Sequence, residues 1–156
     1  MNRADLKEAL QHPNVTAFLR AIRLGEGTSD ELGYYRIVGG GSFTDDSVHP
    51  RVKVYLPKYD VYSTAAGAYQ IIWPTWTGLC KQYAFPDFTP DTQDEAAVAL
   101  IAEKHALADV KAGRLGDAVE KCAAIWASLP GSEAGQRTES MAAVKEEYLS
   151  HGGTLA

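Results

Sequence analysis

The sequence has few of the features that mark metal-binding proteins. Only two of its 156 residues are cysteines, Cys80 and Cys122, and neither belongs to a CxxC or Cys/His pattern of the kind that binds zinc. Both lie in apolar segments with helical spacing, so we predict two buried free thiols, with a disulfide formed after export as the alternative. The four histidines are scattered along the chain. We therefore expect no metal and no other cofactor.

Long hydrophobic runs are also missing. The longest apolar stretches, such as "AAVALIA" at 96–102, are far shorter than the ~20 residues of a membrane-spanning helix. The N-terminal "MNRADLKEAL" is charged throughout and lacks the apolar centre of a signal peptide. These absences predict no stable membrane insertion and no signal peptide, and thus a polypeptide that stays in the cytoplasm where it is made.

Basic residues are too few for a nucleic-acid partner. The formal net charge is −5, with a pI near 5.3, and the sequence contains no basic stripe. A hydrophobic content of 46% in 156 residues is enough for a real core. We predict a single domain over 1–156, most simply a monomer.

Apolar spacing and turn residues predict a helical protein with a small β region. The expected helices span 3–11, 14–25, 69–84, 89–113, 115–127 and 137–150. Asn14 and Thr89 are the expected N-caps, Pro74 falls in a first turn and Gly113 ends a helix. Between the second and third helices, residues 28–68 are short β-prone pieces separated by Gly, Asp, Ser and Pro, which favour an irregular antiparallel sheet or a pair of hairpins.

This order predicts an α+β fold with a mostly helical lobe and a small irregular β lobe. A cleft between two such lobes is a natural ligand site. Glu26 falls at the junction of the two regions.

Glu26 interrupts an apolar stripe. Val15, Phe18, Leu19 and Ile22 recur at helical spacing, and the next position of the stripe is Glu26, between two glycines. Loss of water raises the pKa of a carboxyl, and the negative end of a helix dipole acts in the same direction. A carboxyl that stays protonated near neutral pH suits a general acid. The alternatives are an ion pair with Arg23 or a solvent-exposed side chain.

Four blocks of sequence carry a resemblance to a known family. They are "GEGT", "GYYRIVGGGSFTDDSVHPR", "STAAGAYQ" and "IWASLPG". In this order and spacing, from about residue 18 to residue 153, the chain resembles the lambda lysozyme family of phage endolysins. The resemblance implies a lysozyme-like two-lobed fold and a lytic transglycosylase. Its partners would be peptidoglycan glycan strands and, for release from the host cytoplasm to the cell wall, a holin.

The resemblance also assigns Glu26 a role. It implies that Glu26 protonates the oxygen between N-acetylmuramic acid and N-acetylglucosamine, after which the 6-hydroxyl of the muramic acid attacks its own anomeric carbon. The product would be a 1,6-anhydro sugar, and one carboxylate would be enough. The alternatives are a muramidase that uses water, with Asp45 as its second carboxylate, and a non-catalytic wall-binding module.

Substrate contacts are predicted around this acid. Tyr69 and Gln70 follow a run of small residues that lets backbone approach a sugar, although a buried Tyr69 at a tight helix entry is the alternative. Asp45 is a candidate for sugar hydroxyls or for a turn, and Tyr34 belongs to the aromatics expected to wall off the acid. The three tryptophans are expected in the core, and loops 51–60 and 130–137 match those that flank the cleft of the family.

The sequence departs from the family pattern at several positions. Tyr35, Val48, Ala68 and Ala134 replace an acid, an acid, an arginine and an aromatic of the family, respectively. The net charge is acidic where that of the lambda enzyme is basic. These departures concern contacts along the glycan and attraction to an anionic wall.

Overall fold

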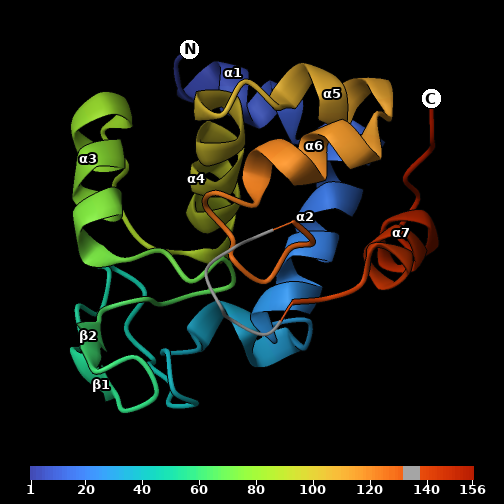
Figure 1. Ribbon diagram of the computed structural model, residues 1–156. Helices are drawn as coiled ribbons and strands as arrows, with labels where there is room; N and C mark the ends of the chain where they lie inside the picture. The colour runs from blue at the N-terminus through green and yellow to red at the C-terminus, as the bar shows by residue number, and fades with distance from the viewer. Residues whose placement is uncertain (132–137) are drawn as a thin grey trace. The chain divides into compact units, whose positions relative to one another are not determined.

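The computed structural model describes residues 1–131 and 138–156. Its elements are α1 (Arg3–Ala9), α2 (Pro13–Glu26), the 3₁₀ helix η1 (Glu31–Tyr35), β1 (Val54–Leu56), β2 (Val61–Ser63), α3 (Trp73–Tyr83), α4 (Pro90–Glu103), α5 (Leu107–Ala112), α6 (Leu115–Cys122) and α7 (Met141–Ser150) (Figure 1). They form two compact units, residues 1–27 with 94–156 (unit 1) and residues 28–93 (unit 2). The predicted α+β class, with a small β region between helices, is confirmed.

Unit 1 is built on α2, which packs against α7 and α5. In Figure 1 the blue α2 runs beside the red α7. The apolar stripe of α2 faces the core, since Val15, Phe18 and Ile22 are buried. Arg3 of α1 forms a bidentate ion pair with the buried Glu95, at 3.0 and 3.2 Å. Helix packing of this kind supplies most of the stability of short helices.

The start of α2 differs from the prediction. His12, and not Asn14, is the N-cap, and its ring nitrogen accepts a hydrogen bond from the Asn14 backbone N–H at 3.1 Å. Pro13 is suited to the first helical position, so the helix begins one residue earlier than expected. The Asn14 side chain is buried and binds the backbone of Lys111 and Thr154 instead.

The helix expected over 89–113 is divided into α4 and α5. His105 adopts a left-handed conformation with φ of 57°, and the Ala106 N–H bonds back to the Ile101 carbonyl, which closes α4. Gly113 does end α5, with φ of 78°, as predicted. A Cβ at Gly113 would lie 2.5 Å from the Thr154 carbonyl oxygen, so the close approach of the C-terminal segment also requires glycine here.

Both cysteines are free thiols, as predicted, but only Cys122 is buried. Burial raises the pKa of the Cys122 thiol to about 12. Cys80 on α3 is half-buried, and burial raises its pKa as well. Neither thiol is therefore activated as a nucleophile.

Unit 2 contains little regular sheet. β1 and β2 pair antiparallel with Tyr55 opposite Tyr62, and isolated bridges join Arg36 to Ser42 and Ala66 to both Ile37 and Ile71. The irregular hairpin region predicted for 28–68 is thus present, although "YY" at 34–35 belongs to η1 and not to a strand.

Aromatic rings and one histidine fill the core of unit 2. His49 is buried with its ring 4.8 Å from that of Phe88, and its Nε2 bonds the Ile71 carbonyl oxygen at 2.8 Å. Burial lowers the pKa of His49, which keeps the ring neutral. Trp76 packs on Phe88 from another side. Trp76 is thus a core residue, as predicted, and so is Trp126 in unit 1.

The buried side chain of Gln93 holds three separate segments of unit 2. Its Oε1 accepts from the Ala68 N–H at 2.9 Å, and its Nε2 donates to the carbonyls of Tyr34 and Phe88 at 3.1 and 2.8 Å. Gly67 makes room for it, since a Cβ there would lie 2.3 Å from Gln93 Oε1. One amide therefore satisfies backbone groups that a larger sheet would pair.

We predict that Gln93→Ala destabilises the protein strongly. Each buried backbone group left without a partner costs ~1–3 kcal/mol, so the loss of three bonds should lower the free energy of unfolding by about 3 kcal/mol or more. Urea denaturation followed by circular dichroism measures this change. Gln82→Ala, at an exposed position on α3, is the control and should change stability little. Equal midpoints for the two variants would contradict the assigned role of Gln93.

Candidate active site

Glu26 is the last residue of α2, and Gly27 ends the helix with a left-handed φ of 71°. The chain passes from unit 1 to unit 2 directly after Gly27. Glu26 is therefore the last side chain of unit 1 before this passage. Its side chain is half-buried, while the stripe residue one turn earlier, Ile22, is completely buried.

The last turn of α2 is packed against Ser128, which belongs to the "ASLPG" block. A Cβ at Gly25 would lie 2.5 Å from Ser128 Oγ and 3.1 Å from its Cβ. Glycine inside a helix costs ~0.5–1 kcal/mol relative to alanine, so its presence here requires another reason. That reason is the close approach of Ser128 to the helix beside the acid.

Burial raises the pKa of Glu26 from 4.5 to about 7. The buried Ser128 hydroxyl acts in the opposite direction and offsets part of this rise, although it forms no regular hydrogen bond with the described residues. An ion pair with Arg23 would have lowered the pKa, so burial dominates over that alternative. A substantial fraction of Glu26 is thus protonated near neutral pH, as a general acid requires.

Tyr34 and Tyr69 lie together in unit 2. Their rings meet edge to face with centroids 6.4 Å apart. Tyr69 is only 2% exposed, which matches the alternative of a buried tyrosine better than a sugar platform. Tyr34, in η1, is half-buried, so part of this residue is accessible to solvent.

The sequence predicted that Tyr69 and Gln70 open a helix, and this prediction is wrong. Both residues precede α3 in a turn, in which Gln70 has φ of 50° and its side-chain Nε2 donates to the Gly67 carbonyl at 2.8 Å. Ile72 and Pro74 fix the start of α3 three residues later, because Pro74 suits the first turn. Gln70 is half-buried, and no hydrogen bond from the described residues uses its Oε1.

Asp45 is exposed and forms a turn. Its Oδ1 accepts from the backbone N–H and the hydroxyl of Ser47, at 3.0 and 2.6 Å, and these bonds lower its pKa. Asp46 accepts from the Tyr35 hydroxyl at 2.8 Å. The hydrogen bonds of Asp45 thus run to Ser47 and not toward the two tyrosines, which fits the turn-forming alternative.

Three residues, one in unit 1 and two in unit 2, escaped the sequence analysis. Ser128 packs on Gly25, Gln93 holds the Ala68 N–H, and the buried Thr28 donates its hydroxyl to the Ala68 carbonyl at 2.5 Å. Thr28 and Ser128 belong to the "GEGT" and "ASLPG" segments that carry the family resemblance, and this position was the available signal. Gln93 lies outside the quoted blocks, in the polar helix start "PDTQDE", so no feature of the sequence distinguished it.

The two predicted flanking loops are described to different extents. Residues 51–60 include β1 and the turn that leads to β2. Of the loop at 130–137, residues 132–137 lie outside the described residues, and Ala134 is among them. Among the residues that the structure describes, no group of three or more His, Cys, Asp or Glu side chains is arranged to hold a metal ion. The described helices are too short or too polar to cross a membrane.

Comparison with solved structures identifies the class of protein as lysozyme-like. The structure of bacteriophage lambda lysozyme complexed with a chitohexasaccharide matches with a TM-score of 0.86 and 36% identity, over 92% of this chain and 97% of that one. A second structure of lysozyme from bacteriophage lambda matches with a TM-score of 0.81 and 35% identity, covering 92% of this chain and 97% of that one.

Sequence comparisons then give the family. The Endolysin family model matches residues 16–155. The endolysin of Escherichia phage P2 is 39% identical over 93% of this chain and 96% of its own, and that of Escherichia phage lambda is 39% identical over 89% and 91%. The chain belongs to the endolysin family. It is a phage endolysin that acts on peptidoglycan, which favours an enzyme over a non-catalytic wall-binding module.

The raised pKa of Glu26 predicts a pH-dependent effect of Glu26→Gln on stability. Folded protein holds a proton that unfolded protein loses between pH 4.5 and about 7, so wild-type stability should fall as pH rises through this range. Glutamine does not titrate, so the variant lacks this pH-dependent loss of stability. Relative to wild type, the variant should gain up to about 3 kcal/mol between pH 4 and pH 8.

Urea denaturation at both pH values measures this gain, and NMR titration of the Glu26 side chain gives the pKa directly. Asp45→Asn is a suitable control, because the lowered pKa of Asp45 places its titration below the tested range, so the difference between this variant and wild type should stay nearly constant from pH 4 to pH 8. A constant difference between Glu26→Gln and wild type across the range would contradict a raised pKa.

Proposed function

We propose that this endolysin is a lytic transglycosylase, with Glu26 as its catalytic acid and base. The observation that carries the proposal is the half-buried carboxyl of Glu26, with a pKa raised to about 7 at the end of α2. Such a group is present as both acid and carboxylate near neutral pH. It is thus suited to give a proton in one step and to take one in the next.

The proposed reaction consumes no water. Protonated Glu26 donates its proton to the oxygen that joins C1 of N-acetylmuramic acid to N-acetylglucosamine, and this C–O bond breaks. The 6-hydroxyl oxygen of the same muramic acid bonds to C1, and its proton passes to the Glu26 carboxylate. The products are a 1,6-anhydromuramic acid end and a free N-acetylglucosamine 4-hydroxyl, and Glu26 is again protonated.

Attack from within the sugar explains how one carboxylate can suffice. The 6-hydroxyl is tethered to its own reacting carbon, so proximity replaces a positioned water. Enzymes that use water need a second carboxylate ~5–9.5 Å from the first. The candidate for that role, Asp45, is exposed and engaged by Ser47, which supports the mechanism with a single acid.

We propose unequal substrate roles for the remaining site residues. Gln70 would accept a hydrogen bond from a sugar hydroxyl or acetamide through Oε1, and the accessible part of Tyr34 would pack on a sugar. Tyr69 would act indirectly, as the buried support of the Tyr34 ring. Asp45 would bind sugar hydroxyls through its free oxygen. The chitohexasaccharide bound to the related lysozyme supports a chain of several sugars as ligand.

We further propose that the protein reaches its substrate through a membrane lesion made by a holin and acts as a monomer. The described helices offer no membrane-spanning segment of their own. The family and the cell-wall substrate support this order of events, in which the enzyme accumulates in the host cytoplasm before release.

We predict that Glu26→Gln reduces lysis by at least about a hundredfold. General acids contribute ~10²–10⁴-fold to a rate, and glutamine keeps the shape but cannot supply the proton. Turbidity of permeabilised Gram-negative cells measures the rate, and circular dichroism confirms the fold. Glu31→Gln, at an exposed position in η1, is the matched control and should retain the wild-type rate. A folded Glu26→Gln variant that lyses cells faster than a hundredth of the wild-type rate would refute the assignment.

The second prediction concerns the product. Digestion of purified peptidoglycan in ¹⁸O-labelled water should release fragments that end in 1,6-anhydromuramic acid and carry no label at C1, as mass spectrometry can determine. Asp45→Asn should keep this product and most of the rate. Labelled fragments, one water heavier, together with an Asp45→Asn variant slowed a hundredfold or more, would identify a muramidase that uses water.

A further inference from the structure

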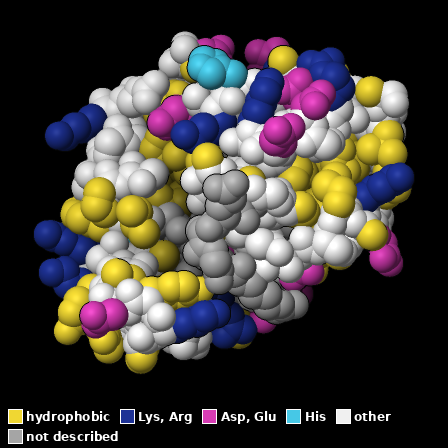
Figure 2. Space-filling view, viewed as in Figure 1, with side chains coloured by type: hydrophobic (Ala, Val, Ile, Leu, Met, Phe, Trp, Pro, Cys, Tyr) yellow, Lys and Arg dark blue, Asp and Glu magenta, His cyan; other side chains and the backbone are white. Residues whose placement is uncertain are grey.

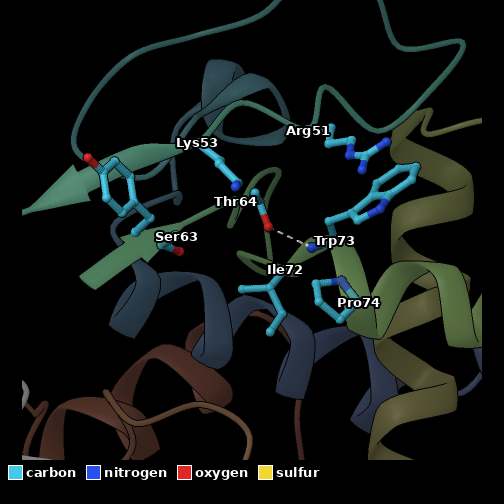
Figure 3. Close-up of a pocket in the computed structure, with 8 residues that line it drawn as sticks. Arg51, Lys53, Ser63, Thr64, Ile72, Trp73 and Pro74 are labelled. Carbon is cyan, nitrogen blue, oxygen red and sulfur yellow. Dashed lines mark hydrogen bonds between the residues drawn. The ribbon is translucent and has the colours of Figure 1, made fainter.

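Unit 2 contains a hollow that the proposed chemistry does not use. It lies among the start of β1, the end of β2 and the beginning of α3, and its volume is about 450 Å³ (Figure 3). Small-molecule sites commonly have volumes of ~300–1,000 Å³. The hollow is therefore large enough for a group of several atoms in addition to a single charge.

Two cations face this hollow. Arg51 and Lys53 both line it, and the Arg51 guanidinium lies 4.7 Å from the centre of the Trp73 ring. In Figure 3 Lys53 lies close to Thr64, and Arg51 lies beside Trp73. No acidic side chain of the described residues lines the hollow or forms an ion pair with either cation.

The beginning of α3 adds to this positive character. Ile72, Trp73 and Pro74 line the hollow, so the positive end of the helix dipole lies at its wall. The backbone N–H of Trp73 already donates to Thr64 Oγ1 at 2.8 Å, which fixes the wall in place. Attraction of an anion thus comes chiefly from Arg51 and Lys53.

Apart from Ser63 and Thr64, the rest of the lining is largely apolar and open to solvent. Ile72 is 42% exposed and Tyr62 is 69% exposed. Trp73 is half-buried, so it does not lie in the core as predicted for all three tryptophans. Figure 2 shows hydrophobic and basic side chains gathered over the region of β1, β2 and α3. A ligand for this hollow should combine a carboxylate with small apolar groups.

The substrate of an endolysin contains such a group. Each muramic acid of peptidoglycan carries a peptide stem with alanine methyl groups and several carboxylates, whereas the sugars themselves are neutral because the lactyl carboxyl forms the amide bond to the stem. A net charge of −5 would repel this anionic polymer, so a local cationic site has a clear advantage.

We propose that the hollow between Arg51, Lys53, Ile72 and Trp73 binds a carboxylate-bearing peptide stem of peptidoglycan. The proposal rests on the action of the protein on peptidoglycan and is independent of how the glycosidic bond is broken. Arg51 and Lys53 would bind stem carboxylates, and Tyr62, Ile72 and Trp73 would contact the alanine side chains.

Binding of two soluble ligands tests this assignment. One is the disaccharide N-acetylglucosaminyl-N-acetylmuramic acid with a tetrapeptide stem, and the other is the same disaccharide with a free lactyl group. Neither contains the bond that the enzyme cleaves, so the result does not depend on the proposed reaction. NMR titration of the full chain, followed at the Trp73 indole assigned with Trp73→Phe, gives Kd for each ligand.

We expect the stem-bearing disaccharide to bind at least about fivefold more tightly than the stem-free one. Lys53→Gln and Arg51→Gln should each weaken its binding about two- to fivefold, and Arg51→Lys should restore most of the loss because it keeps the charge. Lys58→Gln removes the same charge in the turn of the same hairpin, outside the hollow, and should have no effect. High salt should reduce the advantage of the stem.

Three results would overturn the proposal. Equal affinity of the wild type for both disaccharides would remove the stem as ligand, and the sugars that the two ligands share would then account for any binding. An equal loss in Lys53→Gln and Lys58→Gln would indicate a general effect of charge. Unchanged binding in both Lys53→Gln and Arg51→Gln, with the fold intact, would exclude the two cations.

Discussion

The loss of water around a single carboxyl is the constraint on which the candidate active site depends. An exposed glutamate is almost fully ionised at pH 7, and such a group cannot act as a general acid there. The last turn of α2 meets this constraint through packing, since Gly25 admits Ser128 directly against the helix. The cost appears as a raised pKa, which means that the folded protein is less stable near neutral pH than it would be with an uncharged residue at position 26.

Unit 2 has a different problem, because its backbone must be satisfied with little sheet. Only three residue pairs join β1 to β2, so most carbonyls and N–H groups of residues 28–93 need other partners. Buried polar side chains supply several of them: Thr28 binds the Ala68 carbonyl, Gln93 binds the Ala68 N–H, and His49 binds the Ile71 carbonyl. Two of these bonds hold opposite sides of the same residue, Ala68. Tyr69 and Gln70, the next residues, are fixed by this arrangement more than by any strand or helix.

The contrast between the two units explains what the sequence could predict. Helix positions in unit 1 follow from apolar spacing, and this spacing also located Glu26, because an acid on a buried stripe is conspicuous. Local competition decided the details: Pro13 moved the start of α2, and a left-handed His105 divided 89–113 into two helices. Neither outcome is visible in periodicity, since both depend on which neighbouring backbone groups find partners.

Unit 2 could be predicted only as a region. Its order comes from contacts between residues far apart in the chain, such as Gln93 with Tyr34, and no local pattern announces them. For the same reason Tyr69 and Gln70 were assigned to a helix that in fact begins at Trp73. The sequence blocks compensated in part, because Thr28 and Ser128 lie within them. A block that carries the family resemblance indicates that its residues have a role, while the structure is needed to show which partner each residue binds.

Net charge alone is a poor guide to how this protein meets an anionic substrate. At physiological ionic strength, charges more than ~8 Å apart in solvent are largely screened, so the sign of a local cluster matters more than the total. Ion pairs neutralise several basic side chains of unit 1. Asp109 pairs with Lys121 and Arg114, and Glu95 pairs with Arg3. Arg51 and Lys53 have no such partner in unit 2. An acidic chain can thus present a local positive surface, while Asp109 and Glu95 are engaged in ion pairs of unit 1.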